Sequence, residues 1–203
     1  YAHIAEGFMG SDAQLKPVYG DGNGGPSVDK AKKVLADAGI TEKVTLRLQY
    51  NPDHYGPSSG DEYAMYKTQL EEGGLFSVDL QSTEWVQYAK DRTADVYPLH
   101  QLGWFPDFSD PDNYLTPFFS KDTFLVNHYD SPEVQKLLVA QATEGDQAKR
   151  EQLIKDIENI LVVDLPTLPL LQGKQFAVSA KGVTGAGDTL DPSFKFRMGV
   201  LAK

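Results

Sequence analysis

Two segments in which apolar and polar residues alternate constrain the fold of this chain more than any other feature. They are VTLRLQY, residues 44–50, and FSVDLQST, residues 76–83, and a period of two is typical of β-strands. Helical patterns lie before, between and after them, at residues 27–38, 61–72 and 85–92. Strands that alternate with helices along a chain predict an α/β fold.

The expected helix ends carry residues that suit them. Ser27 can cap the first helix with its side-chain oxygen, and Gly39 can adopt the left-handed conformation that ends it. Another helix is expected to begin at Ser131–Pro132, because proline fits the first helical position. A later helix has an apolar face formed by Leu153, Ile157, Ile160 and Leu161.

Further elements are expected in the second half of the chain. DVYPLHQLGW, residues 95–104, reads as a third strand, in which Pro98 implies a sheet edge or a bulge. Residues 110–119 read as a turn followed by a short helix. Residues 167–180 and 191–202 are expected to form two late strands.

Charge and composition restrict the possible partners. The formal net charge of the 203 residues is −10, which disfavours nucleic acid, because phosphates are bound by clustered Lys and Arg. The same charge disfavours an anionic membrane surface. The chain has no cysteine, which excludes disulfides, thiolate metal sites and cysteine nucleophiles. No apolar run approaches the roughly 20 residues of a membrane-spanning helix.

The segment GWFPDFSDPDNYL, residues 103–115, places aromatic residues around aspartates. A carboxylate in apolar surroundings, such as that of Asp107, loses much of its hydration energy unless a cation pairs with it. No Lys or Arg lies between Arg92 and Lys121. Asp107 therefore stays solvated, is held by amides at a helix N-terminus, or receives its cation from a ligand. The residues themselves leave these three readings open.

Metal binding and hydrolysis fit this segment less well. A calcium loop needs a turn glycine and regularly spaced oxygen ligands, and Pro111 disrupts that pattern. Asp110 and Asp112 are instead expected to cap the following turn and helix. A glycoside hydrolase needs two acids that face one substrate. No second acid has the aromatic setting of Asp107, and no metal or cofactor is expected.

The same segment resembles a known signature, G-W-x-x-D-x-x-D-P-D-N. It is that of the extracellular solute-binding proteins of peptide ABC importers (family 5), and the dipeptide- and oligopeptide-binding type is the most similar. Other segments agree with this family in the same order along nearly the whole chain. They are DKAKKVLADAG, EWVQYAKDRTADVYPLHQLGW, YDSPEVQKLLVAQATEGDQAKREQLIKDIENILVVDLPTLPLL and LDPSFKFRMGVLAK.

The resemblance implies a two-lobed periplasmic-binding-protein clamp that is far longer than this chain. The chain then corresponds to the C-terminal lobe, an α/β domain with a mixed sheet flanked by helices. Residues 1–26 are expected to cross from the missing first lobe, residues 27–165 to form the second-lobe domain, and residues 166–203 to supply return strands and a C-terminal tail.

The resemblance also implies a set of ligand-binding residues. Asp107 would pair with the α-ammonium of a peptide, and Gly103 and Phe105 would hydrogen-bond its extended backbone. Trp104 and Trp85 would flank side-chain pockets. A sixth candidate, Gln101, stands where some oligopeptide binders carry a basic residue.

The function implied is binding without chemistry. The expected partners are a peptide ligand and the membrane permease of an ABC importer, and the chain is expected to be a monomer that does not bind nucleic acid. The alternatives are another solute, namely an oligosaccharide, a nickel complex or haem, or else a carboxylate-dependent glycoside hydrolase. The chain begins at Tyr1 without methionine, which suggests a processed fragment. The location implied is extracellular or periplasmic, with a lipid anchor on an N-terminal portion that precedes Tyr1.

Overall fold

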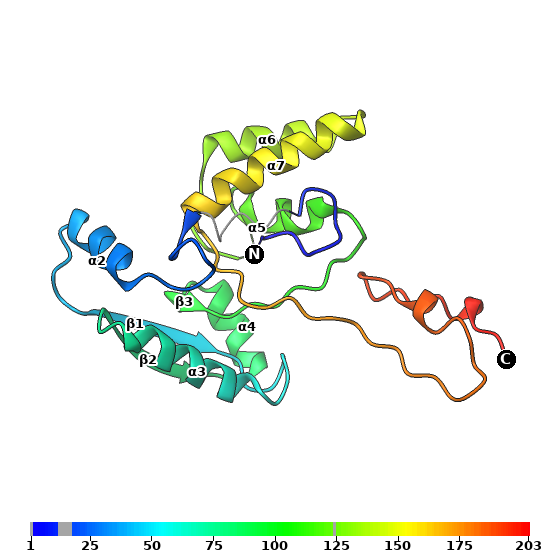
Figure 1. Cartoon of the computed structure of the whole chain (residues 1–203), viewed down its shortest axis with the longest axis horizontal. Helices are drawn as coiled ribbons and strands as arrows, with labels where there is room; N and C mark the ends of the chain where they lie inside the picture. The colour runs from blue at the N-terminus through cyan, green and yellow to red at the C-terminus, as the bar shows by residue number, and fades with distance from the viewer. Residues whose placement is uncertain (1, 12–17, 124) are drawn as a thin grey trace. The chain divides into compact units, whose positions relative to one another are not determined.

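The structure, a computed structural model, describes residues 2–11, 18–123 and 125–203 (Figure 1). The chain divides into two compact units. The sheet unit consists of Tyr19–Gly103 with Phe124–Val126. The helical unit consists of Tyr1–Val18, Trp104–Thr123 and Asn127–Lys203. We describe each unit by itself.

The sheet unit contains a parallel sheet, with helices along the chain between its strands. The described strands are β1 (Val44–Tyr50), β2 (Phe76–Ser82) and β3 (Leu99–His100), and they pair in the order β2-β1-β3. Leu48 of β1 lies opposite Leu80 of β2 on one side and Leu99 of β3 on the other. The three helices are α2 (Val28–Asp37), α3 (Ser59–Glu72) and α4 (Trp85–Thr93).

The first two predicted strands and the three predicted helices of this unit are confirmed. Ser27 caps α2 by accepting the Lys30 N–H at 3.3 Å, and Gly39 follows the helix with a φ of +73°. Helix α3 packs against β1 and β2 around the buried side chains of Leu48, Tyr63 and Val78. This burial of apolar surface is the main force that holds the helix on the sheet.

The third strand is shorter than expected. It pairs with β1 only at Leu99 and His100, at the edge of the sheet that Pro98 predicted. Proline has no backbone N–H, so Pro98 cannot donate a hydrogen bond to a neighbouring strand, and the pairing starts only after it. A mixed sheet was expected, with both parallel and antiparallel pairs. The described strand pairs are all parallel.

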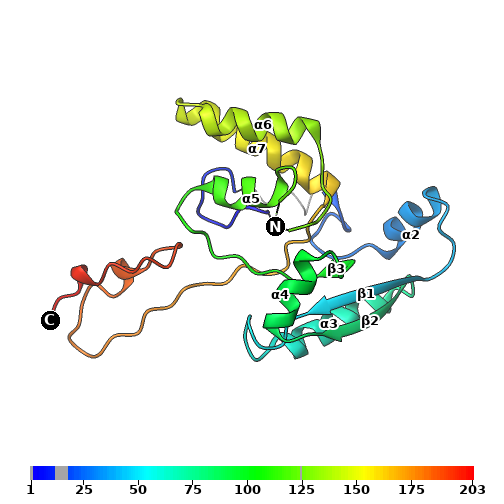
Figure 2. The same ribbon diagram turned by 180° about the vertical axis from the view of Figure 1, so that it is seen from behind.

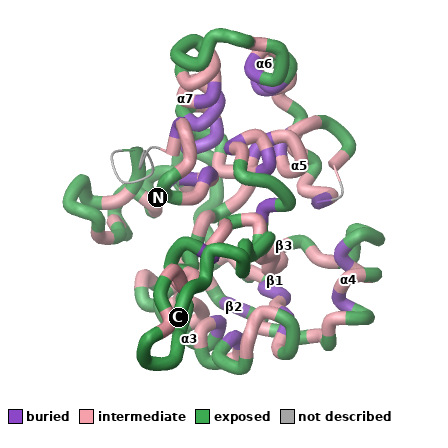
Figure 3. Tube along the Cα trace, turned by 90° about the vertical axis from the view of Figure 1, so that its right-hand side faces the viewer, coloured by how far each residue is buried: buried purple, intermediate pink, exposed green. Residues whose placement is uncertain are grey.

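The helical unit is built around an α-helical hairpin. Helices α6 (Pro132–Thr143) and α7 (Gln147–Asp164) lie side by side in Figures 1 and 2. The short helices η1 (Pro111–Tyr114) and α5 (Thr116–Phe119) pack below them. Figure 3 shows the buried stretches of α6 and α7. The shared core consists of Ile4, Leu115, Phe119, Val134, Leu138, Ile154, Ile157 and Leu161.

A buried carboxylate attaches the N-terminal segment to this hairpin. Glu158 of α7 is fully buried, and its two oxygens accept the backbone N–H groups of His3, at 3.2 Å, and Ile4, at 3.0 Å. The His3 ring lies 3.5 Å from the same carboxylate. These contacts satisfy a group that would otherwise be costly to bury.

The two late strands that were expected at residues 167–180 and 191–202 are wrong. The described residues there contain only the short helix η3 (Met198–Val200) and one isolated bridge, between Thr184 and Ala202. An alternating sequence forms a strand only where a neighbouring strand completes its hydrogen bonds, and the described chain supplies none here. Phe176 and Val178 are accordingly 84% and 98% exposed. The predicted division into residues 1–26, 27–165 and 166–203 stays a prediction.

Within the described part of the chain, no helix combines the length and the apolar character needed to cross a bilayer.

Candidate functional site

In the sheet unit, three candidate residues follow the carboxyl ends of the strands. Chain segments leave β1 toward residues 51–55, β2 toward Trp85, and β3 toward residues 101–103. Because the strands are parallel, these segments leave the same edge of the sheet. That edge is where open α/β sheets usually bind ligands.

Trp85 is held in an aromatic cluster at this edge. The His54 ring lies flat on its indole, with ring centroids 3.6 Å apart and 4° between the planes. The Tyr55 ring meets the indole edge-on at 5.8 Å. The backbone N–H of Trp85 donates to Asp53 at 3.1 Å. The residues after β1 therefore set the position of the tryptophan that begins α4.

Gln101 is occupied by contacts within the protein. Its side-chain oxygen accepts the backbone N–H of the buried Asn51 at 2.8 Å, and its backbone N–H donates to Gln49 of β1 at 3.0 Å. Its carbonyl accepts the hydroxyl of the buried Tyr88 at 2.6 Å. The structure thus gives Gln101 a role in joining the ends of β1 and β3.

Gly103 lies under the ring of Tyr55. A Cβ atom at this position would be 2.6 Å from Cε1 and 2.8 Å from Cδ1 of that ring. Burial raises the pKa of the Tyr55 phenol above its ordinary value. The absence of a side chain at Gly103 therefore serves a contact inside the sheet unit.

In the helical unit, one buried amide fixes the positions of Trp104 and Asp107. The side-chain oxygen of Asn113 accepts the indole N–H of Trp104 at 3.1 Å and the backbone N–H of Asp107 at 2.8 Å. Asn113 is only 3% exposed, so these bonds are shielded from water. The Trp104 ring also packs edge-on against Phe118, with centroids 5.0 Å apart.

The backbone of Asp107 is hydrogen-bonded to described residues of the helical unit, but its carboxylate is not. Asp107 is exposed, and its side chain has no hydrogen bond or ion pair with any described residue. Lys195 donates to the Asp107 carbonyl at 2.7 Å, not to the carboxylate. Phe105 is 64% exposed and packs edge-on against Phe194 at 4.7 Å.

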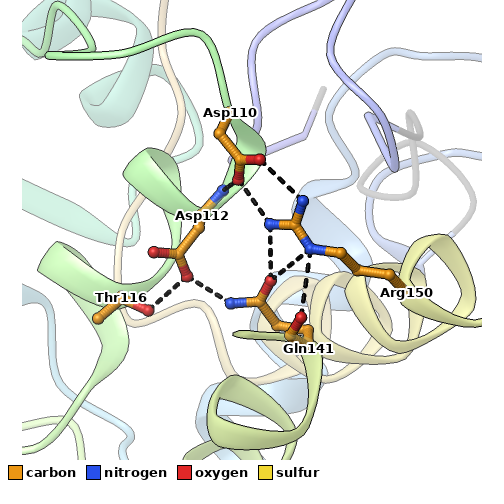
Figure 4. A network of polar contacts seen from close by, with 5 residues as sticks. All are labelled: Asp110, Asp112, Thr116, Gln141 and Arg150. Carbon is orange, nitrogen blue, oxygen red and sulfur yellow. Dashed lines mark hydrogen bonds and ion pairs between the residues drawn. The ribbon is translucent and has the colours of Figure 1, made fainter. Parts of the chain in front are cut away.

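The other two aspartates of the segment are engaged by the helical hairpin (Figure 4). Asp110 forms a two-pronged ion pair with Arg150 of α7, at 2.6 and 2.8 Å, which holds the pKa of its carboxyl below the ordinary value. Asp110 also caps η1 by accepting the Asp112 N–H at 2.9 Å, as predicted. Asp112 does not act as a helix cap: its carboxylate accepts from the Thr116 hydroxyl at 2.6 Å and from the side chain of Gln141.

The structure leaves the six candidates in two groups. Trp85, Gln101 and Gly103 belong to the sheet unit, and Trp104, Phe105 and Asp107 to the helical unit. Nowhere in the described ranges do three His, Cys, Asp or Glu side chains gather as a metal site requires.

Sequence reasoning missed the residues that hold these candidates in place. They are His54, Tyr55, Asn113, Gln141 and Arg150. Asn113 stands within the quoted signature, which could have drawn attention to it. Arg150 is 40 residues from Asp110, and nothing local in the sequence links the two.

Comparison with known proteins gives the family. A sequence model of the bacterial extracellular solute-binding proteins, family 5, matches residues 1–125. The oligopeptide-binding protein OppA of Bacillus subtilis is 30% identical over 149 residues, which cover 70% of this chain and 26% of that protein. A dipeptide-binding protein of Pseudomonas aeruginosa is 27% identical over 161 residues, covering 77% of this chain and 30% of that protein.

A solved structure of a periplasmic binding protein has the same fold as this chain. The periplasmic binding protein DppA of Helicobacter pylori, solved with the peptide STSA, superimposes with a TM-score of 0.69 at 23% identity, over 81% of this chain and 31% of that one. The chain thus spans about a quarter to a third of the length of these relatives. The match over residues 1–125 and the shared fold together establish that the chain belongs to the bacterial extracellular solute-binding proteins, family 5.

Proposed function

We propose that this chain is part of the peptide-binding component of an ABC importer, and that Asp107 binds the free α-ammonium of the peptide. The proposal draws on relatives named for binding oligopeptides and dipeptides. The family is one of binding proteins, and we propose that the chain catalyses no reaction.

The contrast among three neighbouring aspartates carries the proposal. Arg150 neutralises Asp110, and the carboxylate of Asp112 is hydrogen-bonded to Thr116 and Gln141. Only Asp107 combines a fixed backbone with a carboxylate that has no partner among the described residues. A charged acceptor in that state suits a cation that arrives with the ligand, because the ion pair forms only on binding.

The remaining candidates take roles that suit an extended peptide. The backbone groups of Gly103 and Phe105 would hydrogen-bond the ligand main chain, a mode that gives affinity without reading side chains. Trp104 and Trp85 would contact ligand side chains. Gln101 would act indirectly, since its polar groups already bond within the sheet unit.

We further propose that the complete protein is a monomer that delivers its peptide to a membrane permease. It would work outside the cytoplasmic membrane, attached by a lipid. The monomeric state, the delivery and the lipid attachment are proposed for a protein of the relatives' full length, of which this chain matches 26–30%.

The test is a two-by-two cycle in the family-length protein, meaning this chain together with the further sequence that its relatives possess. Wild type and Asp107→Asn are each titrated by calorimetry with a free and an N-acetylated peptide. The change keeps the shape of the side chain but leaves the ligand ammonium without a counter-ion. We expect a loss of roughly 2–5 kcal/mol for the free peptide and little further loss for the acetylated peptide.

Asp122→Asn provides the matched control, because Asp122 is an exposed aspartate of the same helical unit. It should change neither affinity. An interaction energy within error of zero in the Asp107 cycle would remove the amine-binding role. Equal losses for both peptides would point to a purely local structural role for Asp107.

A further inference from the structure

The α6–α7 hairpin contacts residues 104–115, here called the Asp107 segment, through a continuous set of polar side chains. Arg150 of α7 and Gln141 of α6 reach the segment at Asp110 and Asp112 (Figure 4). Neither residue belongs to the ligand-binding signature, and each makes several specific bonds. These directed bonds fix the orientation of the groups they join, which packing alone does not.

Gln141 is the centre of this network. It is fully buried, and its side-chain oxygen accepts from Nη2 of Arg150 at 3.0 Å and from Nε at 3.2 Å. Its side-chain nitrogen donates to Asp112. The amide thus has partners on both its polar atoms, and it holds the guanidinium in one orientation. A buried amide with hydrogen bonds on both polar atoms favours one arrangement of its surroundings.

Arg150 uses this orientation to grip Asp110. Its two terminal nitrogens bond the two carboxylate oxygens at 2.6 and 2.8 Å, a fork that lysine cannot reproduce. The Arg150 side chain is 20% exposed and that of Asp110 is 33% exposed, so the pair is partly shielded from solvent. The ion pair therefore restrains the direction of Asp110 as well as its distance.

The restraint continues from Asp110 to Asp107. The Asp110 carboxylate caps η1 at the Asp112 N–H, and the Asp110 carbonyl accepts the N–H of Asn113 at 3.1 Å. Asn113 in turn accepts the N–H of Asp107 and the indole N–H of Trp104. Every link in this series is a hydrogen bond between named groups within the helical unit.

We infer that Arg150 and Gln141 are positioning residues for Asp107 and Trp104, acting through Asp110 and Asn113. The hairpin sets where the Asp107 carboxylate is presented, although no hairpin residue touches it. The functional meaning of this placement rests on the proposed amine-binding role of Asp107, whereas the placement itself can be tested independently.

The first experiment measures hydrogen exchange by NMR on the 203-residue chain. In Arg150→Met, the Asp107 amide and the Trp104 indole N–H should exchange roughly tenfold faster, which is the order expected when a charge-assisted bond is lost. Arg150→Lys should show a smaller increase, because it keeps the charge and loses the fork. The amides of Ile157 and Leu161, in the α7 core, should keep their rates.

Lys155→Met is the matched control. It removes a cation of α7 that forms an ion pair with Glu151 of the same helix at 2.9 Å. It should not change exchange at Asp107 or Trp104. Unchanged rates at both groups in Arg150→Met would overturn the inference. A uniform increase that includes Ile157 and Leu161 would also overturn it, since that result means general destabilisation. If Arg150→Met does not fold, Arg150→Lys decides by the same criteria.

The second experiment connects placement with binding. In the family-length protein, Arg150→Lys should reduce the preference for a free over an acetylated peptide by several-fold, without abolishing binding. No change in this preference, together with faster exchange at Asp107, would show that the placement does not serve amine recognition. Failure of the Asp107→Asn cycle would instead reject the amine-binding role and leave the exchange result standing.

Discussion

The ring of Tyr55 covers Gly103 so closely that a Cβ atom on this glycine would lie 2.6 Å from the ring carbon Cε1. The ring cannot move away freely, because it also packs against His54 and Trp85. Gly103→Ala is therefore expected to lower the free energy of unfolding by about 1–3 kcal/mol, as other overpacked sites do. Urea unfolding followed by circular dichroism measures the loss.

Tyr55→Leu supplies the second arm of this test. If the clash with the ring is the cause, Gly103→Ala should cost much less when Tyr55 has already been replaced. An equal cost in both backgrounds would mean that the glycine is needed for its backbone conformation, not for the space that Tyr55 occupies.

Replacement of Glu158 should detach the N-terminal segment from α7. Glu158→Ala leaves the partly buried N–H of His3 and the buried N–H of Ile4 without acceptors, and we expect a loss of about 3 kcal/mol in unfolding free energy. Glu158→Gln retains one acceptor oxygen and should lose clearly less. Denaturant titration of the two variants checks this order, and equal losses would contradict the hydrogen-bond explanation.

The stability of the sheet unit should depend on pH through His100. Burial lowers the pKa of the His100 imidazole below its ordinary value of 6.5. It outweighs a hydrogen bond with the Tyr97 backbone, which raises the pKa, while the charges of Arg92 and Asp95 act in opposite directions. As the pH falls below 6.5, the unfolded chain takes up a proton that the folded chain still refuses. The free energy of unfolding should therefore decrease, until the pH reaches the folded pKa.

His100→Gln removes this titration and isolates its effect. The difference in unfolding free energy between wild type and variant should shift against the wild type between pH 7.5 and pH 5.5, which denaturant titrations at the two values measure. A difference that does not change with pH would show that His100 makes no net contribution in this range.

Much of the sheet unit follows from local sequence. The alternation in residues 44–50 and 76–82 is confirmed in β1 and β2, because one face of each strand packs against helix α3. Ser27 and Gly39 end α2 as predicted, since helix caps depend on residues near the helix end. Pro98 correctly predicts an edge strand, because its missing N–H is a property of the residue itself.

Contacts between distant residues could not be predicted in this way. The sequence by itself points to Asp107 through its aromatic neighbours, and leaves open what its carboxylate meets. It also suggests that the aspartates have no cation nearby, because Arg150 lies far along the chain. The tertiary structure brings Arg150 to Asp110 and Gln141 to Asp112. Of the three aspartates, Asp107 is the one whose carboxylate has no partner among the described residues.

Residues 167–180 and 191–202 show that a local pattern can also predict an element that does not form. Residues 167–180 have a strand-like sequence and form no strand, because a strand requires hydrogen bonds from a second chain segment. Local patterns determine which residues can form a helix, a cap or a strand. Only the tertiary structure decides which of these groups find partners, because hydrogen bonds and ion pairs depend on distances in space that sequence separation does not contain.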